Sequence, residues 1–225
     1  MEIIPVLDLK EGLVVHARQG QREAYPPIVS RLCATSAPQD VLAGLLQVHS
    51  FATIYVADLD AIERKGDHAD AINELARAYR GVEFWVDNAN AAPIPRDNVR
   101  HVAGSESIPP GEAIATRMDK RAILSLDFRG ADFLGPPELL QQPSLWPARV
   151  IVMTLSRVGS SDGPDLERLA LIKQRAGAAR HIYAAGGVRG RADLDALRHA
   201  GAAGVLVASA LHDGRLSPAD LAEFG

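Results

Sequence analysis

The sequence predicts an α/β protein, and the favoured arrangement is a single-domain (β/α)8 TIM barrel. Eight short apolar runs recur along the 225 residues, each too short for a helix and rich in Val and Ile. Runs that are apolar throughout are typical of strands buried on both faces, as in parallel sheets. Eight units of similar length, with amphipathic stretches between them, favour a closed barrel over an open doubly wound sheet.

The predicted strands and helices alternate along the chain. The strands are, in order, Ile3–Leu9, Thr53–Ala57, Val82–Val86, Val99–Ala103, Ala122–Leu126, Val150–Met153, His181–Ala185 and Ala203–Val207. Helices are expected where apolar residues recur every three or four positions. These stretches are Pro38–Ser50, Asp67–Tyr79, Pro164–Arg175 and Arg191–Ala200. A last helix is expected from Pro218, because Ser217 and Asp220 flank it as in a helix N-cap.

One crossover departs from this pattern. Residues 87–99 contain two prolines and no amphipathic stretch, so we expect the third helix to be truncated or missing. Residues 135–147 are also rich in proline and leave room for a short helix at Glu138–Gln142. No low-complexity linker divides the chain, which predicts one domain over residues 1–225.

Composition excludes several classes of protein. The net charge is −4, no block of Lys or Arg occurs, and aromatic residues make up 5% of the chain. These values disfavour a general nucleic-acid binder, which needs a basic face. Charged residues within the first ten positions fit neither a signal peptide nor a membrane-spanning helix. The one cysteine, Cys33, fits a reducing compartment, so we expect a cytoplasmic protein.

Two aspartates are the main catalytic candidates. Asp8 ends the first predicted strand and Asp127 ends the fifth, in the similar segments VLDLK and SLDFR. Active sites of such barrels lie at the C-terminal ends of the strands, and strands one and five face each other across the barrel. Two carboxyl groups so placed can act as general acid and general base. The alternative is that each caps its own loop or pairs with Lys10 or Arg129.

A second candidate site is an anion-binding turn. Gly186 and Gly187 follow the seventh strand, where backbone N–H groups can close on a phosphate. Ala208 and Ser209, after the eighth strand, can add N–H donors and a hydroxyl group. The alternative is a plain tight turn.

Other polar residues at strand ends are candidates for substrate contacts. They are Asp58, Asn88, Gly104, Ser105 and Thr154. Asp58 and Asp60 could bind a divalent cation through oxygen ligands, but no His or third carboxylate follows at ligand spacing. We therefore expect loop hydrogen bonds and contacts with substrate hydroxyl groups there, and no metal site.

Several segments, in order, resemble one known family. They are IIPVLDLKEGLVVHARQG (3–20), IYVADLDAI (54–62), AILSLDFRG (122–130), LSRVGSSDGPDLERL (155–169), AAGGVRGRADLDAL (184–197) and GAAGVLVASAL (201–211). They resemble the histidine-biosynthesis barrels, and are closer to the phosphoribosyl-formimino aminoimidazole carboxamide ribotide isomerase than to its sister cyclase. The resemblance covers nearly the whole chain.

The resemblance implies a (β/α)8 barrel built from duplicated halves, with two phosphate sites and no cofactor or metal. In the isomerase, an Amadori rearrangement opens an aminoribose ring and converts it to an aminoketose. The matching positions here are Asp8, as the base at C2, and Asp127, as the acid on the ring oxygen.

The chain departs from this family at several places. Val158 stands where the family has an Asp, and the loop after the fifth strand lacks the usual Gly-Trp segment. After the third strand, residues 87–90 (DNAN) replace a glycine run that holds the second phosphate, whereas Gly104 and Ser105 keep the other half of that site. After the eighth strand, Ala208 and Ser209 replace Gly-Arg. On the sixth strand, Met153 stands where a Thr is usual, and Thr154 comes one place later, which puts it on the opposite face. The departures indicate a divergent relative, similar to a branch linked to methanopterin-type one-carbon metabolism.

The leading hypothesis is therefore an isomerase acting on a small phosphorylated sugar or sugar-amine. We expect one phosphate on the substrate and a hydrogen-bond-donating or positively charged group near residues 87–90. One alternative is a lyase or condensing enzyme in pterin or furan cofactor assembly on the same barrel. Another is a barrel without catalytic activity. The sequence leaves the oligomeric state open.

Overall fold

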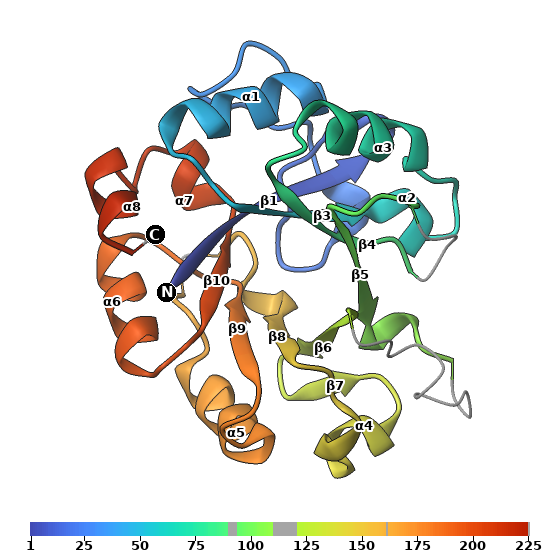
Figure 1. Ribbon diagram of the computed structural model, residues 1–225, viewed down its shortest axis with the longest axis vertical. Coiled ribbons are helices and arrows are strands. Elements are labelled where there is room, and N and C mark those ends of the chain that lie inside the picture. The colour runs from blue at the N-terminus through green and yellow to red at the C-terminus, as the bar shows by residue number, and fades with distance from the viewer. Residues whose placement is uncertain (90–93, 110–120, 161, 225) are drawn as a thin grey trace.

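A computed structural model describes residues 1–89, 94–109, 121–160 and 162–224, and it confirms the closed barrel. Eight parallel strands form its wall, and the pairing of the first with the last closes it (Figure 1). The wall strands are β1 (Glu2–Lys10), β3 (Thr53–Asp58), β4 (Glu83–Asp87), β5 (Val99–Gly104), β6 (Ile123–Arg129), β8 (Arg149–Thr154), β9 (His181–Ala185) and β10 (Gly204–Val207). All eight overlap the predicted strands. Because β1 and β6 are four strands apart either way around, they lie opposite each other.

Helices surround the wall (Figure 1). They are α1 (Pro38–Val48), α2 (Leu59–Ile62), α3 (Ala69–Ala78), α4 (Pro137–Gln141), α5 (Leu166–Ala176), α6 (Arg191–His199), α7 (Ser209–His212) and α8 (Pro218–Phe224). No helix occurs in the described residues between Asp87 and Val99, as expected from the two prolines. The four-residue helices α2 and α7 begin within two residues of a strand end and are too short to show an apolar periodicity.

Two layers of apolar side chains pack the barrel. One layer lies between the strands and the helices, and the other fills the interior of the barrel. Each wall strand contributes at least one residue to the interior layer, among them Ile4, Tyr55, Trp85, Val102, Ile123, Ile151, Tyr183 and Leu206. Side chains alternate along a strand, so residues an even number of positions from these also face the interior. This parity decides which strand-end residues can reach the mouth of the barrel.

Two short strands form hairpins that the sequence did not predict. The strand β2 (Leu13–Val14) pairs antiparallel with the end of β1, and β7 (Asp132–Leu134) pairs antiparallel with the end of β6. The strands β1 and β6, which contain the similar segments VLDLK and SLDFR, therefore each end in a hairpin. Strands of two and three residues are too short for an alternating pattern to be read from the sequence.

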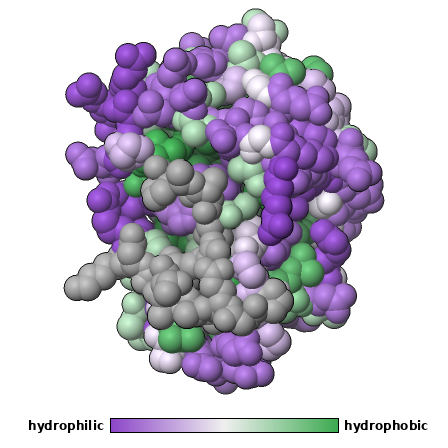
Figure 2. All heavy atoms as spheres, turned by 90° about the vertical axis from the view of Figure 1, so that its right-hand side faces the viewer, coloured by the Kyte–Doolittle hydropathy of each residue, from purple (hydrophilic) through white to green (hydrophobic). Residues whose placement is uncertain are grey.

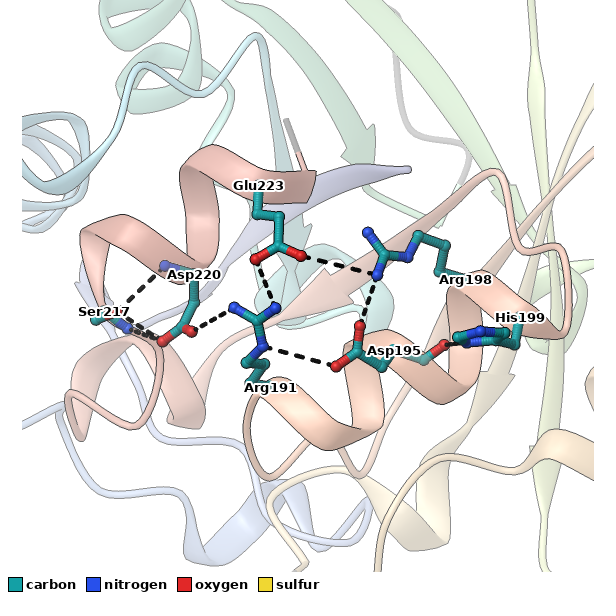
Figure 3. A network of polar contacts seen from close by, with 7 residues as sticks. All are labelled: Arg191, Asp195, Arg198, His199, Ser217, Asp220 and Glu223. Carbon is teal, nitrogen blue, oxygen red and sulfur yellow. Dashed lines mark hydrogen bonds and ion pairs between the residues drawn. The ribbon is translucent and has the colours of Figure 1, made fainter.

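Helices α6 and α8 are joined by a network of charged side chains (Figure 3). Arg191 forms ion pairs with Asp195, Asp220 and Glu223. Ser217 and Asp220 exchange hydrogen bonds, since Ser217 N–H donates to Asp220 Oδ2 at 2.9 Å and Asp220 N–H donates to Ser217 Oγ at 3.2 Å. The capping pattern expected at Pro218 is therefore confirmed.

The surface carries few large apolar side chains. Among the described residues only Val29, Leu166 and Leu171 are large, apolar and exposed. Figure 2 shows one side of the molecule covered largely by hydrophilic side chains, with separate apolar patches. In the described part of the chain, no helix combines the length and the apolar character that crossing a membrane requires.

Candidate active site

A pocket opens at the C-terminal ends of the wall strands, where the barrel fold predicts an active site. The empty volume of the pocket is about 900 Å³, which includes open solvent at its mouth. Its polar lining comes from both sides of the barrel: Asp8, Arg22, Tyr25, Tyr55, Asp87, Glu106, Asp127, Ser160 and Ser209. Gly186, Gly187 and Ala208 also line it. Six of the predicted site residues therefore meet in one cavity.

Asp8 projects into the pocket from β1, four positions after the interior residue Ile4. Burial raises the pKa of its carboxyl group to about 7, and the nearby Arg22 guanidinium opposes that rise. Among the described residues, Asp8 has no hydrogen-bond donor and no ion-pair partner for its side chain. In particular, Lys10 Nζ donates to the carbonyl oxygen of Arg22 at 2.7 Å, so the pairing with Lys10 that was left open does not occur.

Asp127 projects into the pocket from β6, opposite Asp8, and is 4% exposed. Its Oδ1 accepts a hydrogen bond from Ser125 Oγ at 2.6 Å, and its Oδ2 accepts from the N–H of Glu106 at 3.1 Å. The pKa of this carboxyl group is raised to about 7, first by burial and then by the charges of Glu106 and Asp87, against the effect of these hydrogen bonds. No described residue forms an ion pair with it.

Gly104 and Ser105 lie beside Asp127 and are not part of the pocket lining. Ser105 is fully buried; its Oγ lies 3.1 Å from Asp127 Oδ2 and accepts from the backbone N–H of Asp127 at 2.9 Å. A Cβ atom at Gly104 would lie 3.5 Å from Asp127 Oδ2 and 2.8 Å from Asp87 Oδ2. The structure thus places these two predicted residues where they support carboxyl groups.

Asp87 is a third carboxyl group in the pocket, and it is 7% exposed. It lies two positions after the interior residue Trp85. Tyr55 Oη and the N–H of Ala89 each donate to it at 3.3 Å. Burial raises its pKa to about 6; the Ala89 N–H opposes this rise, Glu106 adds to it, and Arg22 opposes it.

Arg22 and Glu106 form an ion pair at the mouth. Arg22 belongs to a 3-10 turn, Arg22–Ala24, in the segment between β2 and α1, and Glu106 to a 3-10 turn, Ser105–Ser107, after β5. Both side chains are mostly buried. Sequence reasoning missed this pair because it joins two irregular segments 84 positions apart.

The glycine turn after β9 lies at another part of the pocket. Gly186 and Gly187 have φ angles of 102° and 87°, which only glycine adopts readily. A Cβ atom on Gly187 would lie 2.2 Å from the carbonyl oxygen of Gly163, so the close approach of two loops also requires glycine. Helix α7 begins nearby at Ser209, whose Oγ lies 3.1 Å from His16 Nε2. The first N–H groups of a helix have no acceptor within it.

Besides Gly104 and Ser105, three more predicted residues lie outside the pocket lining, and strand parity explains two of them. Asp58 and Thr154 are each one position past an inward-facing residue, Ala57 or Met153, so they face outward. Thr154 Oγ1 lies 3.4 Å from Asp165 Oδ2. Asn88 follows the end of β4 and lines a neighbouring depression.

Asp58 is a structural side chain, 1% exposed. It caps α2 by accepting from the N–H of Ala61 at 3.2 Å, and it accepts from the backbone N–H and Nδ1 of His68 at 2.7 and 2.8 Å. Within the described ranges, no three His, Cys, Asp or Glu side chains are grouped as a metal site requires.

We expect Asp58→Asn to destabilise the protein by about 2 kcal/mol at pH 7. Both carboxylate oxygens of Asp58 accept hydrogen bonds, and in the variant an amide N–H₂ group, itself a donor, replaces one of these acceptors. Hydrogen bonds from His68 lower the pKa of Asp58 despite its burial. The stability that Asp58 adds is therefore present above its unfolded pKa and lost as the pH falls. Urea unfolding at pH 7 and pH 3 measures this effect, and a loss as large at pH 3 as at pH 7 contradicts it.

Comparison with known proteins agrees with this geometry. A model of the family described as "Histidine biosynthesis protein" matches residues 2–88 and 141–217. An uncharacterized protein of Methanocaldococcus jannaschii is 30% identical over 222 residues, covering 96% of this chain and 95% of the relative. An isomerase from Myxococcus xanthus, named for an imidazole-4-carboxamide with two phosphoribosyl groups, is 30% identical over 246 residues. The alignment covers 99% of this chain and 98% of the relative.

A further isomerase of the same name, from Listeria welshimeri, is 26% identical over 253 residues, covering 99% of this chain and 98% of the relative. The family model leaves residues 89–140 unmatched, which include Glu106 and Asp127, whereas the full-length relatives align across them. Fold, site position and sequence agree, and this chain belongs to the histidine biosynthesis protein family of (β/α)8 barrels.

Proposed function

We propose that this protein is an isomerase that catalyses an Amadori-type rearrangement of a monophosphorylated sugar-amine. The observation that carries the proposal is the pair Asp8 and Asp127, which project from opposite strands into one cavity. Burial raises the pKa of each carboxyl group to about 7. At neutral pH each can therefore both take and give a proton.

The surroundings of the two groups support different roles. Arg22 lowers the pKa of Asp8 against the effect of burial, which favours the ionised form that a base needs. Glu106 and Asp87 add to the effect of burial at Asp127, which favours the protonated form that an acid needs. We assign Asp127 as the acid that protonates the ring oxygen as the C1–O bond breaks. Asp8 is then the base that removes the proton from C2, which gives an enaminol. C1 then takes up a proton and the C2 hydroxyl group releases one, so that the C2 ketone of the aminoketose forms and no net proton is gained or lost.

The phosphate group is assigned to the turn at Gly186 and Gly187 together with the start of α7. Phosphate sites of such barrels are commonly built from the loops after strands seven and eight and a short extra helix. Helix α7 is a short helix in that position, and Ser209 adds a hydroxyl group that lines the pocket.

The relatives' name indicates a substrate with two phosphoribosyl groups, and we propose a different substrate here. The part of the pocket formed by β4 and β5 presents Asp87 and Glu106, and carboxylates repel a phosphate dianion. A lyase that works through a Schiff base needs a lysine, but no lysine is among the described lining residues. We place the reaction in the cytoplasm, where Cys33, a free cysteine, stays reduced.

The proposal is tested by following N-substituted 5-phosphoribosylamines by ¹³C NMR with the full-length protein. The expected result is loss of the anomeric carbon signal and growth of a ketone signal, catalysed by the wild type. Inorganic phosphate should inhibit competitively. Cleavage into two products in place of an aminoketose supports the lyase alternative. No turnover across a panel of such compounds, together with no inhibition, contradicts the proposal.

A further inference from the structure

We propose that the substrate carries a protonated amino group at the end opposite its phosphate, and that Asp87 binds this group. The inference rests on the proposed function, which assigns the phosphate to the Gly186–Gly187 turn. It goes further by giving the chemical class of the other end of the substrate.

The charges of the pocket walls favour a cation. Four carboxyl groups line the pocket, from Asp8, Asp87, Glu106 and Asp127. Among the described lining residues Arg22 is the one Lys or Arg, and its guanidinium pairs with Glu106. Asp87 and Asp127 form no ion pair with any described residue, although the charge of Arg22 acts on Asp87 from farther away. A ligand cation next to them would therefore meet carboxyl groups without an ion-pair partner.

Two of these carboxyl groups converge on a single point. The position that a Cβ atom would take on Gly104 is 2.8 Å from Asp87 Oδ2 and 3.5 Å from Asp127 Oδ2. Because Gly104 has no side chain, both oxygens lie beside it, and the charge of Asp87 raises the pKa of Asp127. An ammonium group has three donors, so it can bind both oxygens and remove this repulsion.

Asp87 retains acceptor capacity for such a ligand. A carboxylate has about four lone-pair positions, and the two donors that reach Asp87 in the described structure are both long, at 3.3 Å. Tyr55 Oη and the N–H of Ala89 therefore hold the carboxyl group in position without saturating it. A second phosphate at this end would instead meet carboxyl groups on buried walls, where Coulomb repulsion is poorly screened.

The test compares two series of small probes by titration calorimetry at pH 7.5. One series is aminoalkyl phosphates with two to six carbons, and the other is the hydroxyalkyl phosphates of equal length. We expect one chain length at which the amino compound binds the wild type at least tenfold more tightly, which corresponds to about 1.4 kcal/mol. Alkane bisphosphates of that length should bind no more tightly than the hydroxyalkyl phosphate.

Three variants assign the effect. Asp87→Asn should bring the amino and hydroxy probes to within about twofold of each other while hydroxyalkyl phosphate affinity stays the same. Glu106→Gln provides a second test at the same wall, and should weaken the preference at least threefold. Asp58→Asn changes an aspartate outside the pocket and should keep the full preference.

The outcomes separate this inference from the proposed function. Equal binding of both series to the wild type overturns the amine site and leaves the phosphate site standing. A preference that survives in both Asp87→Asn and Glu106→Gln also overturns it. If no phosphate of either series binds, the proposed phosphate site fails, and the inference fails with it.

Discussion

Asp8→Asn and Asp127→Asn are each expected to lower kcat for the best aminoribose phosphate by at least about 1,000-fold. Positioned general acids and bases contribute about 100- to 10,000-fold, and an amide of the same shape can do neither task. Substrate affinity should change much less, because the phosphate is bound elsewhere in the pocket. Steady-state kinetics on the full-length variants measure both quantities.

Asp132→Asn is the matched control for this experiment. Asp132 lies on β7, beside the end of β6, and is exposed, so its loss removes a carboxylate near the site without entering the pocket. It should retain kcat within about twofold. The assignment is wrong if either Asp8→Asn or Asp127→Asn retains a tenth of wild-type kcat. Equal loss in all three variants would indicate a general electrostatic effect and not two specific proton transfers.

The wild-type pH profile adds a further check on the same pair. One group must be ionised and the other protonated, and burial gives both a pKa of about 7. The two apparent values belong to the pair as a whole. Activity should therefore peak near pH 7 and fall on both sides, and each single variant should lose this bell shape.

The pattern of apolar runs in the sequence was sufficient to predict the barrel fold. Mostly apolar runs of four to seven residues located all eight wall strands, because a strand buried on both faces tolerates few polar residues. The alternation of side chains along each strand also shows which residues face the interior of the barrel. Counting in twos from Ile123 places Asp127 inside the barrel, whereas counting from Ile151 places Thr154 outside it. The same count from Trp85 brings Asp87 inward.

Arg22 and Glu106 show what the sequence could not supply. Their backbones belong to irregular turns, where no periodicity fixes the direction of a side chain. Their contact depends on how two loops far apart in the chain pack over the barrel mouth. The pKa values of the carboxyl groups could not be predicted from the sequence either, because an unfolded chain gives each carboxyl group its ordinary pKa. The shifts of Asp8 and Asp127 follow from burial, which only the folded chain has.

Asp8→Asn is expected to stabilise the protein at pH 8 although it lowers kcat. The pKa of Asp8 rises from 3.8 in the unfolded chain to about 7 in the folded protein. Between these values the folded state holds a proton that the unfolded state has released, so the free energy of unfolding falls as the pH rises from about 4 to about 7. Each pKa unit corresponds to about 1.4 kcal/mol. With a discount for the partial exposure of Asp8, the loss by pH 8 is about 2 to 4 kcal/mol.

The asparagine variant lacks this loss because its side chain does not titrate. Asp8 has no side-chain hydrogen bond to another described residue, so the substitution breaks none of those contacts. Urea unfolding should show equal stability of variant and wild type at pH 4, and a variant more stable by about 2 kcal/mol or more at pH 8. Asp58→Asn is the opposing control, because hydrogen bonds lower the pKa of Asp58, and it should destabilise at pH 8.

Equal stability of Asp8→Asn and wild type at pH 8 would show that the Asp8 carboxyl group ionises in the folded protein as easily as in water. The proposed base would then have an ordinary pKa, and the neutral-pH optimum of the pair would lose its cause. The opposite signs expected for Asp8 and Asp58 have one physical origin. Asp58 has three hydrogen-bond donors for its charge, and Asp8 has none within the described chain. A partly buried carboxyl group that the fold leaves without donors costs stability, and that cost is what keeps Asp8 able to take a proton from a substrate.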